Sequence, residues 1–175
     1  MANSRVNRYA LADYEIAITF PNSLSYGYDT NATSFVEKSG VENDKPIVIG
    51  GPGENGIDGS YTGSITVKRN KELWTTEGDA TGSWVHNKNL DRTGTISVDI
   101  TQVSDQIVTL TYLCSAYESV QDSIGGLEIE IKNIATNETV ASGIDCYITK
   151  IPDHNFKETA DRFTFEFTCG RVMFY

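Results

Sequence analysis

The sequence has no apolar run long enough to cross a bilayer. A membrane-spanning helix needs about 20 consecutive apolar residues, and no such stretch occurs in the 175 residues of the chain. The N-terminus, MANSRVNRYALADYE, also has no apolar segment of the kind that marks a secretory signal. We therefore expect a soluble protein that stays in the cytoplasm in which it is made and has no contact with a membrane.

Cysteine and histidine are both scarce. The three cysteines, Cys114, Cys146 and Cys169, are scattered among apolar residues, a spacing that fits neither a disulfide framework nor a zinc site. We interpret them as buried thiols that behave as small hydrophobic side chains. The only histidines, His86 and His154, lie in polar turns away from any nucleophile or ligand motif. The sequence thus predicts no catalytic residue, no metal site and no cofactor.

Basic residues are outnumbered by acidic ones, 14 to 24, which gives a formal net charge of −10. Conventional nucleic-acid-binding proteins cluster Lys and Arg to neutralise phosphates, whereas the densest basic group here is Lys68, Arg69 and Lys71. An acidic surface has two interpretations. It serves solubility alone, or it lets DNA slide past without binding.

Two further segments resemble ligand-binding motifs, but neither meets the full requirement of its motif. Residues 51–56 read GPGENG and match the glycine spacing of dinucleotide-binding loops. That chemistry needs a helix directly after the glycines, and a turn and a strand are expected there instead. The carboxylates between residues 42 and 58 lack the spacing of a calcium loop. Neither segment predicts a ligand site.

Alternating apolar and polar residues predict one mainly β domain over residues 1–175. Residues 1–13 are expected to form an N-terminal arm, and residues 21–62, rich in Asn, Ser, Gly and Asp, a long loop insertion. Strands are predicted at 15–20, 47–49, 65–67, 83–85, 95–100, 127–131, 144–150, 163–167 and 172–174. The segment 104–121 fits either a helix or a strand; the possible cap at Ser104-Asp105 favours the helix.

Acidic side chains recur on the polar side of several predicted strands. These candidates are Glu15, Asp99, Glu128, Glu130 and Glu166, and Lys68 and Lys132 are exceptions on the same side. Exposed β faces often carry charge for solubility alone. The alternative is a continuous acidic sheet face.

The order of these features resembles the tail tube proteins of contractile-tailed bacteriophages. The resemblance covers residues 9–20 and 60–175, and the segment 21–59 looks like an insertion. Its elements are Ala12-Asp13 before the first strand, GSITV at 63–67, Trp74, GDATG at 78–82, GTISVDI at 94–100, Gln102 with Ser104-Asp105, and the terminal pieces 148–152 and 163–167.

The resemblance implies a β-sandwich or barrel-like fold with one helix packed on its side. It also implies hexameric rings stacked into a hollow tube in the virion tail, assembled in the host cytoplasm, with tail sheath, baseplate and tape measure proteins as partners. DNA would pass through without specific binding. The five acidic candidates would then line the bore, and Tyr26, Tyr28 and Phe35 would contact a neighbouring ring or the sheath.

Other functions fit the same sequence. One is a baseplate or tail terminator protein of the same fold, and another is the tube of a phage-derived secretion or bacteriocin machine. A carbohydrate-binding β-sandwich would use Trp74, Trp84 or Tyr61 as stacking platforms.

Overall fold

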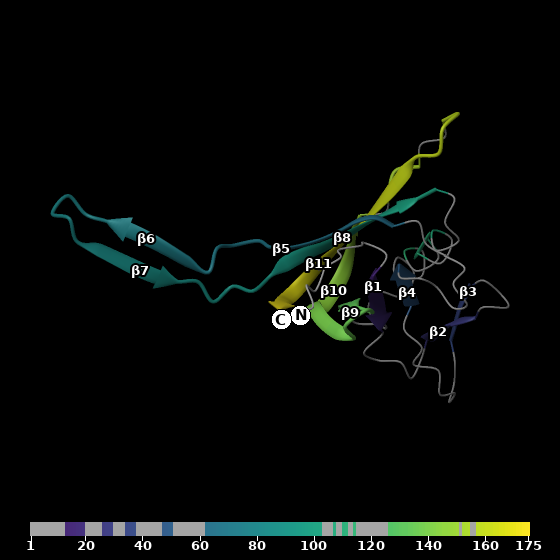
Figure 1. Ribbon diagram of the computed structural model, residues 1–175, viewed down its shortest axis with the longest axis horizontal. Coiled ribbons are helices and arrows are strands. Elements are labelled where there is room, and N and C mark those ends of the chain that lie inside the picture. Colours follow the sequence, from purple (N-terminus) through teal and green to yellow (C-terminus); the bar gives the residue numbers. More distant parts are fainter. Residues whose placement is uncertain are drawn as a thin grey trace, which may run out of the picture.

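A computed structural model of the chain shows a mainly β protein (Figure 1). The structure describes residues 13–19, 26–29, 34–37, 47–50, 62–102, 107, 110, 111, 114, 126–150, 152–154 and 157–175. The strands are β1 (Tyr14–Thr19), β2 (Tyr26–Asp29), β3 (Ser34–Glu37), β4 (Ile47–Gly50), β5 (Thr62–Arg69), β6 (Trp74–Gly78), β7 (Trp84–Lys88), β8 (Gly94–Thr101), β9 (Leu127–Asn133), β10 (Glu138–Lys150) and β11 (Arg162–Phe174).

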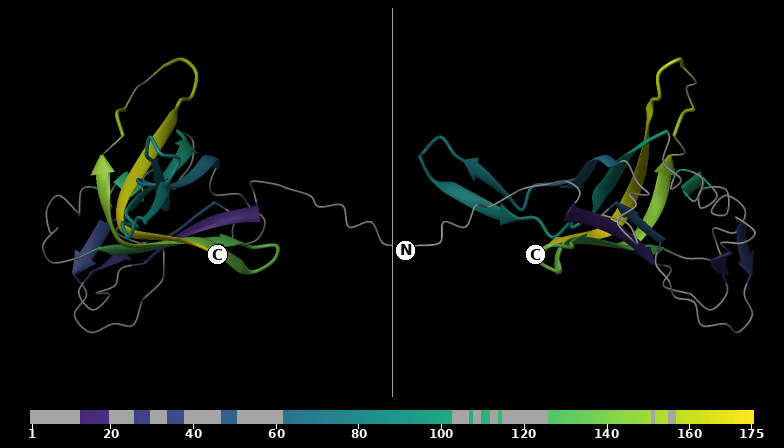
Figure 2. Two further views of the ribbon diagram at one scale, coloured as in Figure 1. Left: turned by 90° about the vertical axis from the view of Figure 1, so that its left-hand side faces the viewer. Right: turned by 45° about the vertical axis from the view of Figure 1, so that its right-hand side comes forward.

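A seven-stranded antiparallel sheet in the order β4-β1-β9-β10-β11-β8-β5 forms the body. Two separate hairpins pair β2 with β3 and β6 with β7. The sheet curls, so that β1 and β9 lie across β8 and β11 (Figure 2). In the part of the chain that the structure describes, β4 and β5 are the sheet's outermost strands.

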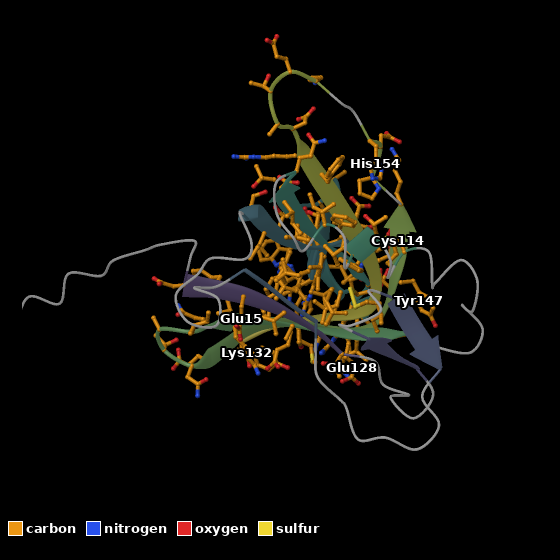
Figure 3. The ribbon with its side chains drawn as sticks, turned by 90° about the vertical axis from the view of Figure 1, so that its right-hand side faces the viewer. Glu15, Cys114, Glu128, Lys132, Tyr147 and His154 are labelled. Atoms are coloured by element: carbon orange, nitrogen blue, oxygen red, sulfur yellow. A yellow bond between two sulfur atoms is a disulfide. The ribbon has the colours of Figure 1, made fainter. Side chains whose placement is uncertain are left out.

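The core follows directly from the period-two pattern of the sequence. Ile96, Val98 and Ile100 of β8 are fully buried, and Phe165 and Phe167 of β11 lie beside them at about 1% exposure. Burying each such side chain stabilises the fold by roughly 1.5–3 kcal/mol. One face of the sheet therefore covers a continuous apolar core, and the intervening residues point to the other face (Figure 3).

The long strand β10 bends because its pairing is interrupted. Its register shifts between Thr139 and Ala141 and again between Gly143 and Cys146, and at the second shift Asp145 has a φ of 55°. Such bulges insert an extra residue, kink the strand and increase its twist. They allow β10 to pair with both β9 and β11 while the sheet curls.

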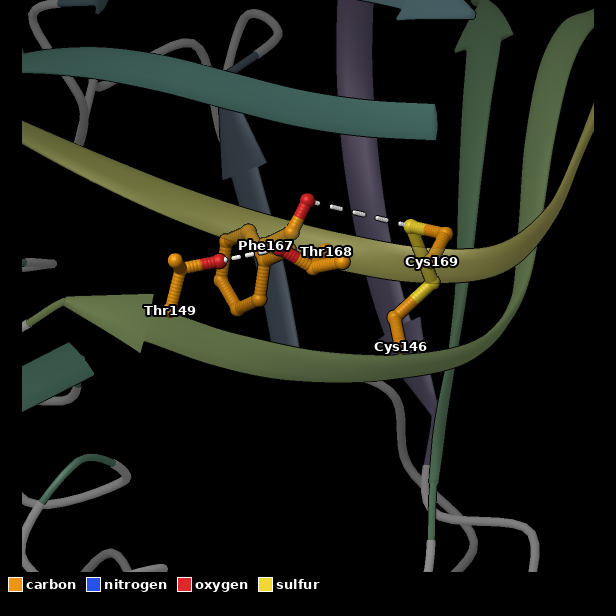
Figure 4. The surroundings of a disulfide bond; sticks show 5 residues. All are labelled: Cys146, Thr149, Phe167, Thr168 and Cys169. Carbon is orange, nitrogen blue, oxygen red and sulfur yellow. Dashed lines mark hydrogen bonds between the residues drawn. A yellow bond between two sulfur atoms is a disulfide. The ribbon is translucent and has the colours of Figure 1, made fainter. Parts of the chain in front are cut away.

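Two of the three cysteines form a disulfide, so the prediction of free thiols is wrong for them. Cys146 and Cys169 face each other across β10 and β11 and are bonded (Figure 4). They are separated by 23 positions in sequence, and only the strand register brings them together. Cys114 is buried and lies outside this disulfide, so the prediction of a buried thiol is confirmed for it.

We expect the disulfide to stabilise the monomer by restricting its unfolded chain. For a closed loop of this size the chain-entropy relation gives about 3 kcal/mol. Urea unfolding with and without a reductant measures the effect directly. A Cys146→Ala/Cys169→Ala variant is the control, because reductant should not change its unfolding midpoint. An unchanged midpoint for the reduced wild-type protein would contradict the expectation.

Most predicted strands are confirmed, including those at 15–20, 47–49, 95–100, 127–131 and 163–167. The strand predicted at 144–150 begins earlier, at Glu138, and the two C-terminal pieces are one strand, β11. The expected loop 21–62 contains the hairpin of β2 and β3 in addition to β4. In the segment 104–121, residues 107, 110, 111 and 114 are helical. The rest of that segment lies outside the described residues, so the predicted helix is not shown.

Candidate functional site: the polar sheet face and the hairpin arm

The side of the sheet opposite the core is lined by polar side chains from six strands. Cross-strand register places Glu15 beside Lys132, Ser142 beside Glu130, and Thr164 beside Asp99. We call this surface the polar face. Its members include Glu15, Thr19, Ser64, Thr66, Lys68, Thr95, Ser97, Asp99, Glu128, Glu130, Lys132, Ser142, Lys150, Arg162, Thr164, Glu166 and Thr168. All five acidic residues nominated from the sequence therefore share one face of one sheet.

Asp99 lies on β8, between β5 and β11, and hydroxyl groups from both neighbouring strands hold it in place. Ser64 of β5 donates a hydrogen bond to one carboxylate oxygen of Asp99, and Thr164 of β11 donates to the other, each at 2.6 Å. Hydrogen bonds to a charged acceptor are stronger than those between neutral groups. The arrangement ties β5, β8 and β11 together on the polar face and leaves Asp99 with a fixed orientation.

Glu130 is also held by neighbours on this face. It accepts a hydrogen bond from the hydroxyl of Thr139 and forms an ion pair with Lys132 at 3.0 Å. The Thr139 hydroxyl is the largest cause, and Lys132 a further one, of a pKa of Glu130 below its ordinary value. The carboxylate thus remains charged at neutral pH, and its contribution to stability is lost only as the pH falls through this lowered pKa.

The polar face also carries basic side chains. Lys68 and Lys132 lie there, as the alternation in the sequence predicts, and the register adds Lys150 and Arg162. Lys132 pairs with Glu130, and Lys150 pairs with Asp153 at 2.7 Å. Counting the five nominated carboxylates against these four cations gives −5 + 4 = −1 for each subunit. These nine charged residues are therefore close to balance, and among the described residues the face is rich in hydroxyl groups and has no dense cluster of cations.

The second prominent feature is a hairpin that projects from the sheet beyond β5 and β8 (Figure 1). We call residues 70–93, which include β6 and β7, the hairpin arm. Its tip is ordered by Asp79, whose carboxylate accepts hydrogen bonds from the backbone N–H groups of Thr81 and Ser83 at 2.8 and 3.0 Å and from the Thr81 hydroxyl at 2.6 Å. These contacts lower the pKa of Asp79, with the Thr81 hydroxyl as the largest cause.

The aromatic contact candidates in the 21–62 segment are located only by their backbone. Tyr26 and Tyr28 lie in β2 and Phe35 lies in β3, and Tyr28 is paired with Phe35 in the register. Their role in contacts with a ring or a sheath remains a prediction. Trp74 and Trp84, the stacking candidates, both lie on the hairpin arm, and Tyr61 lies outside the described residues.

No three or more His, Cys, Asp or Glu side chains in the described ranges are grouped so as to hold a metal ion. Within those same ranges, no helix combines the length and the apolar character that crossing a membrane requires.

Comparison with known families identifies the type of protein. A family model described as "Bacteriophage PhiTE tail tube protein" matches residues 41–174, which is most of the chain. The chain belongs to this family of phage tail tube proteins. It is therefore a structural component of a phage tail, as the resemblance in its sequence implied. No curated protein matches the sequence significantly.

Several solved structures are similar to this tail tube protein in fold. One is the sheath–tube complex of the extracellular contractile injection system PVC in its extended state, with 14% identity, 99% of this chain and 97% of that chain covered, and a TM-score of 0.48. The sheath/tube terminator of PVC has 13% identity, coverages of 95% and 97%, and a TM-score of 0.47. The tube-terminating cap of the anti-feeding prophage has 12% identity, coverages of 99% and 97%, and a TM-score of 0.38.

Proposed function

We propose that this tail tube protein assembles into hexameric rings that stack into a hollow tube, with the polar face lining the bore. One observation carries the proposal. A single curled sheet buries one face in the core and presents the other, with its hydroxyl groups and nearly balanced charges, as one continuous surface. A bore built from this surface would offer DNA few unpaired cations, and unpaired cations are the groups that give proteins non-specific affinity for phosphates.

The edges of the sheet support closure into a ring. β4 and β5 stand at opposite ends of the strand order, and an edge strand presents unpaired N–H and C=O groups to another chain. Pairing the β5 edge of one copy with the β4 edge of the next is a head-to-tail contact, which generates a ring when it closes. Tail sheath, baseplate and tape measure proteins are the proposed partners of the assembled tube, and passage of DNA at ejection is its proposed role.

Negative-stain electron microscopy of the purified protein over a concentration series tests this function. We expect hollow tubes or stacked rings whose length increases with concentration, because each added ring buries new surface. Discrete rings that never stack would favour a terminator instead. Compact monomers at every concentration, measured in parallel by sedimentation velocity, would contradict self-assembly.

A further inference from the structure

The disulfide between Cys146 and Cys169 lies where the two halves of the curled sheet meet (Figure 4). Strand β10 pairs with β9 as far as Cys146, which stands opposite Leu127, and from there to Lys150 it pairs with β11 alone. One half of the sheet contains β4, β1 and β9, the other contains β11, β8 and β5, and both pair with β10 over residues 141–146. The bond therefore lies at the end of the stretch of β10 that both halves share.

The bulge in β10 stands directly beside this bond and bends the strand there. Asp145, next to Cys146, has a φ of 55°, and the register with β9 shifts between Gly143 and Cys146. A Cβ at Gly143 would lie 2.7 Å from the Sγ atoms of both cysteines, so the absence of a side chain makes room for them. Cβ atoms at Gly126 and Gly170 would contact the side chain of Asp145. In so closely packed a region, moving the two sulfur atoms relative to each other must also move a strand or a side chain.

The reduced pair of thiols also fits this site. Both cysteines are fully buried in the apolar core, where a free cysteine behaves as a small hydrophobic side chain. The thiol of Cys169 would have a hydrogen-bond acceptor, because its Sγ lies 3.9 Å from the carbonyl oxygen of Phe167. We therefore expect the dithiol subunit to stay folded. Without the covalent bond, however, the bend in β10 is held less tightly.

We propose that Cys146 and Cys169 form a redox lock on the curl of the sheet, which is closed as a disulfide and open as a dithiol. The inference rests on the proposed closure of the ring through β4 and β5, because these two edge strands belong to different halves of the sheet. The curl sets the angle between the two edges, and the closed lock fixes that angle before subunits meet. Subunits with the open lock must lose more conformational freedom to assemble.

Closing the lock is a two-electron oxidation, and its oxidant is a low-molecular-weight disulfide. One cysteine thiolate attacks this disulfide, which forms a mixed disulfide and releases one thiol. The second cysteine attacks the protein sulfur of the mixed disulfide, which forms the Cys146–Cys169 bond and releases the second thiol. The two protons of the protein thiols pass to the released thiolates. Both sulfur atoms are buried, so each step needs a local opening of the strands. An excess of reduced thiol, as in a reducing cytoplasm, reverses both steps.

The redox state of the wild-type subunit is the first readout. The protein is incubated in an excess of reduced or of oxidised glutathione, checked for folding by circular dichroism, then denatured, alkylated and weighed by mass spectrometry. We expect a folded dithiol in the first buffer and the Cys146–Cys169 disulfide in the second. Cys114 should be alkylated in both and is the internal reference. A subunit that keeps its disulfide in excess reduced glutathione, or that unfolds on losing it, would overturn the lock.

The concentration at which tubes form, measured by sedimentation, is the second readout. Both redox forms are expected to be folded, so a difference between them reports the folded subunit and not the folding equilibrium. We expect the dithiol form to need about tenfold more protein, because ordering even one residue of the bend costs free energy of this size. Tubes that form at equal concentrations in both states would overturn the lock and leave the proposed function intact. A wild-type protein that assembles in neither state would overturn both.

Two variants separate the lock from general effects of the buffers and of stability. Cys146→Ala/Cys169→Ala cannot form the bond, so its assembly should be the same in both buffers, and a redox response of this variant would contradict the lock. Ile100→Val removes one buried methyl group from β8, at the end of that strand far from Cys169. It should lower the urea midpoint but change the assembly concentration by less than about threefold. An effect of Ile100→Val on assembly as large as that of reduction would show that reduction acts through stability alone, and would overturn the lock.

Discussion

Tubes in which Glu128 and Glu166 are replaced by lysine should retain DNA that wild-type tubes let pass. Both residues lie on the polar face, on β9 and β11. The double change adds four charge units, so that the nine charged residues counted above change from −5 + 4 = −1 to +3 in each subunit. In a proposed ring of six subunits, the summed charge of these residues changes from 6 × (−1) = −6 to 6 × 3 = +18.

The expected effect is large because DNA affinity depends on the number of phosphates that a protein neutralises. Six to ten phosphate contacts are enough to change affinity by roughly 10³- to 10⁵-fold over a moderate range of salt. The reversal also leaves Glu130 and Asp99 in place, and these are the two carboxylates with the clearest structural contacts on this face. Assembly should therefore persist while passage of DNA fails.

Co-sedimentation of a labelled DNA duplex with purified tubes, at low and high salt, measures this retention. A variant with Glu138→Lys and Glu158→Lys is the matched control, because it carries the same added charge at exposed positions outside the set that defines the polar face. Equal DNA retention by the two variants would place the bore on another surface. Loss of tubes from the Glu128/Glu166 variant alone would place these residues in a subunit interface.

The local sequence pattern predicted the body of the sheet, because in a half-buried strand apolar residues on the buried side alternate with polar residues on the exposed side. Ile96, Val98 and Ile100 alternate with Ser97 and Asp99, so one strand read alone shows which side is buried. The same reasoning placed the five acidic residues on the polar sides of their strands. It could not show that the strands form one sheet, because that depends on pairing between distant segments.

The features that the sequence could not predict depend on the register of strand pairing. The disulfide needs Cys146 opposite Cys169, and a shift of one residue would turn each side chain to the other face. Lys150 and Arg162 join the polar face for the same reason, since both stand at strand ends where the alternating pattern is weakest. The alternating pattern therefore identified Lys68 and Lys132 on this face but not Lys150 and Arg162. A bulge at Ile148–Lys150, invisible in the sequence, sets the position of Lys150.

The hairpin arm could be predicted only in part, because its sequence does not show that it projects from the sheet. A strand was predicted at 83–85, and β7 confirms it, but its partner β6 was not predicted. Both strands are exposed on both faces, so their sequences carry no apolar side that would show where they pack. Only its projection from β5 and β8 identifies it as an arm (Figure 1).

Replacing Gly94 with valine should destabilise the protein by about 3 kcal/mol and release the base of the arm. Gly94 begins β8, where the strand pairs with both Arg69 and Cys169. A Cβ at this position would collide with the backbone carbonyl oxygen of Lys68 and lie 2.6 Å from Cγ2 of Val172. Overpacking typically costs about 1–3 kcal/mol. A β-branched valine would collide with both a backbone atom and a side chain, so we expect a cost at the upper end of this range.

The control for this change lies on the arm itself. At Gly78 the nearest atom to an added Cβ is the Ser83 carbonyl oxygen, 3.8 Å away, and valine is well suited to an exposed strand. Gly78→Val should therefore keep the wild-type urea midpoint. Because β5 and Val172 would have to separate to admit a side chain at Gly94, limited proteolysis of Gly94→Val should cut the arm base faster than the wild-type arm base. Equal midpoints for the two variants would mean that β5 and the C-terminal end of β11 can move apart without loss of stability, and would contradict this expectation.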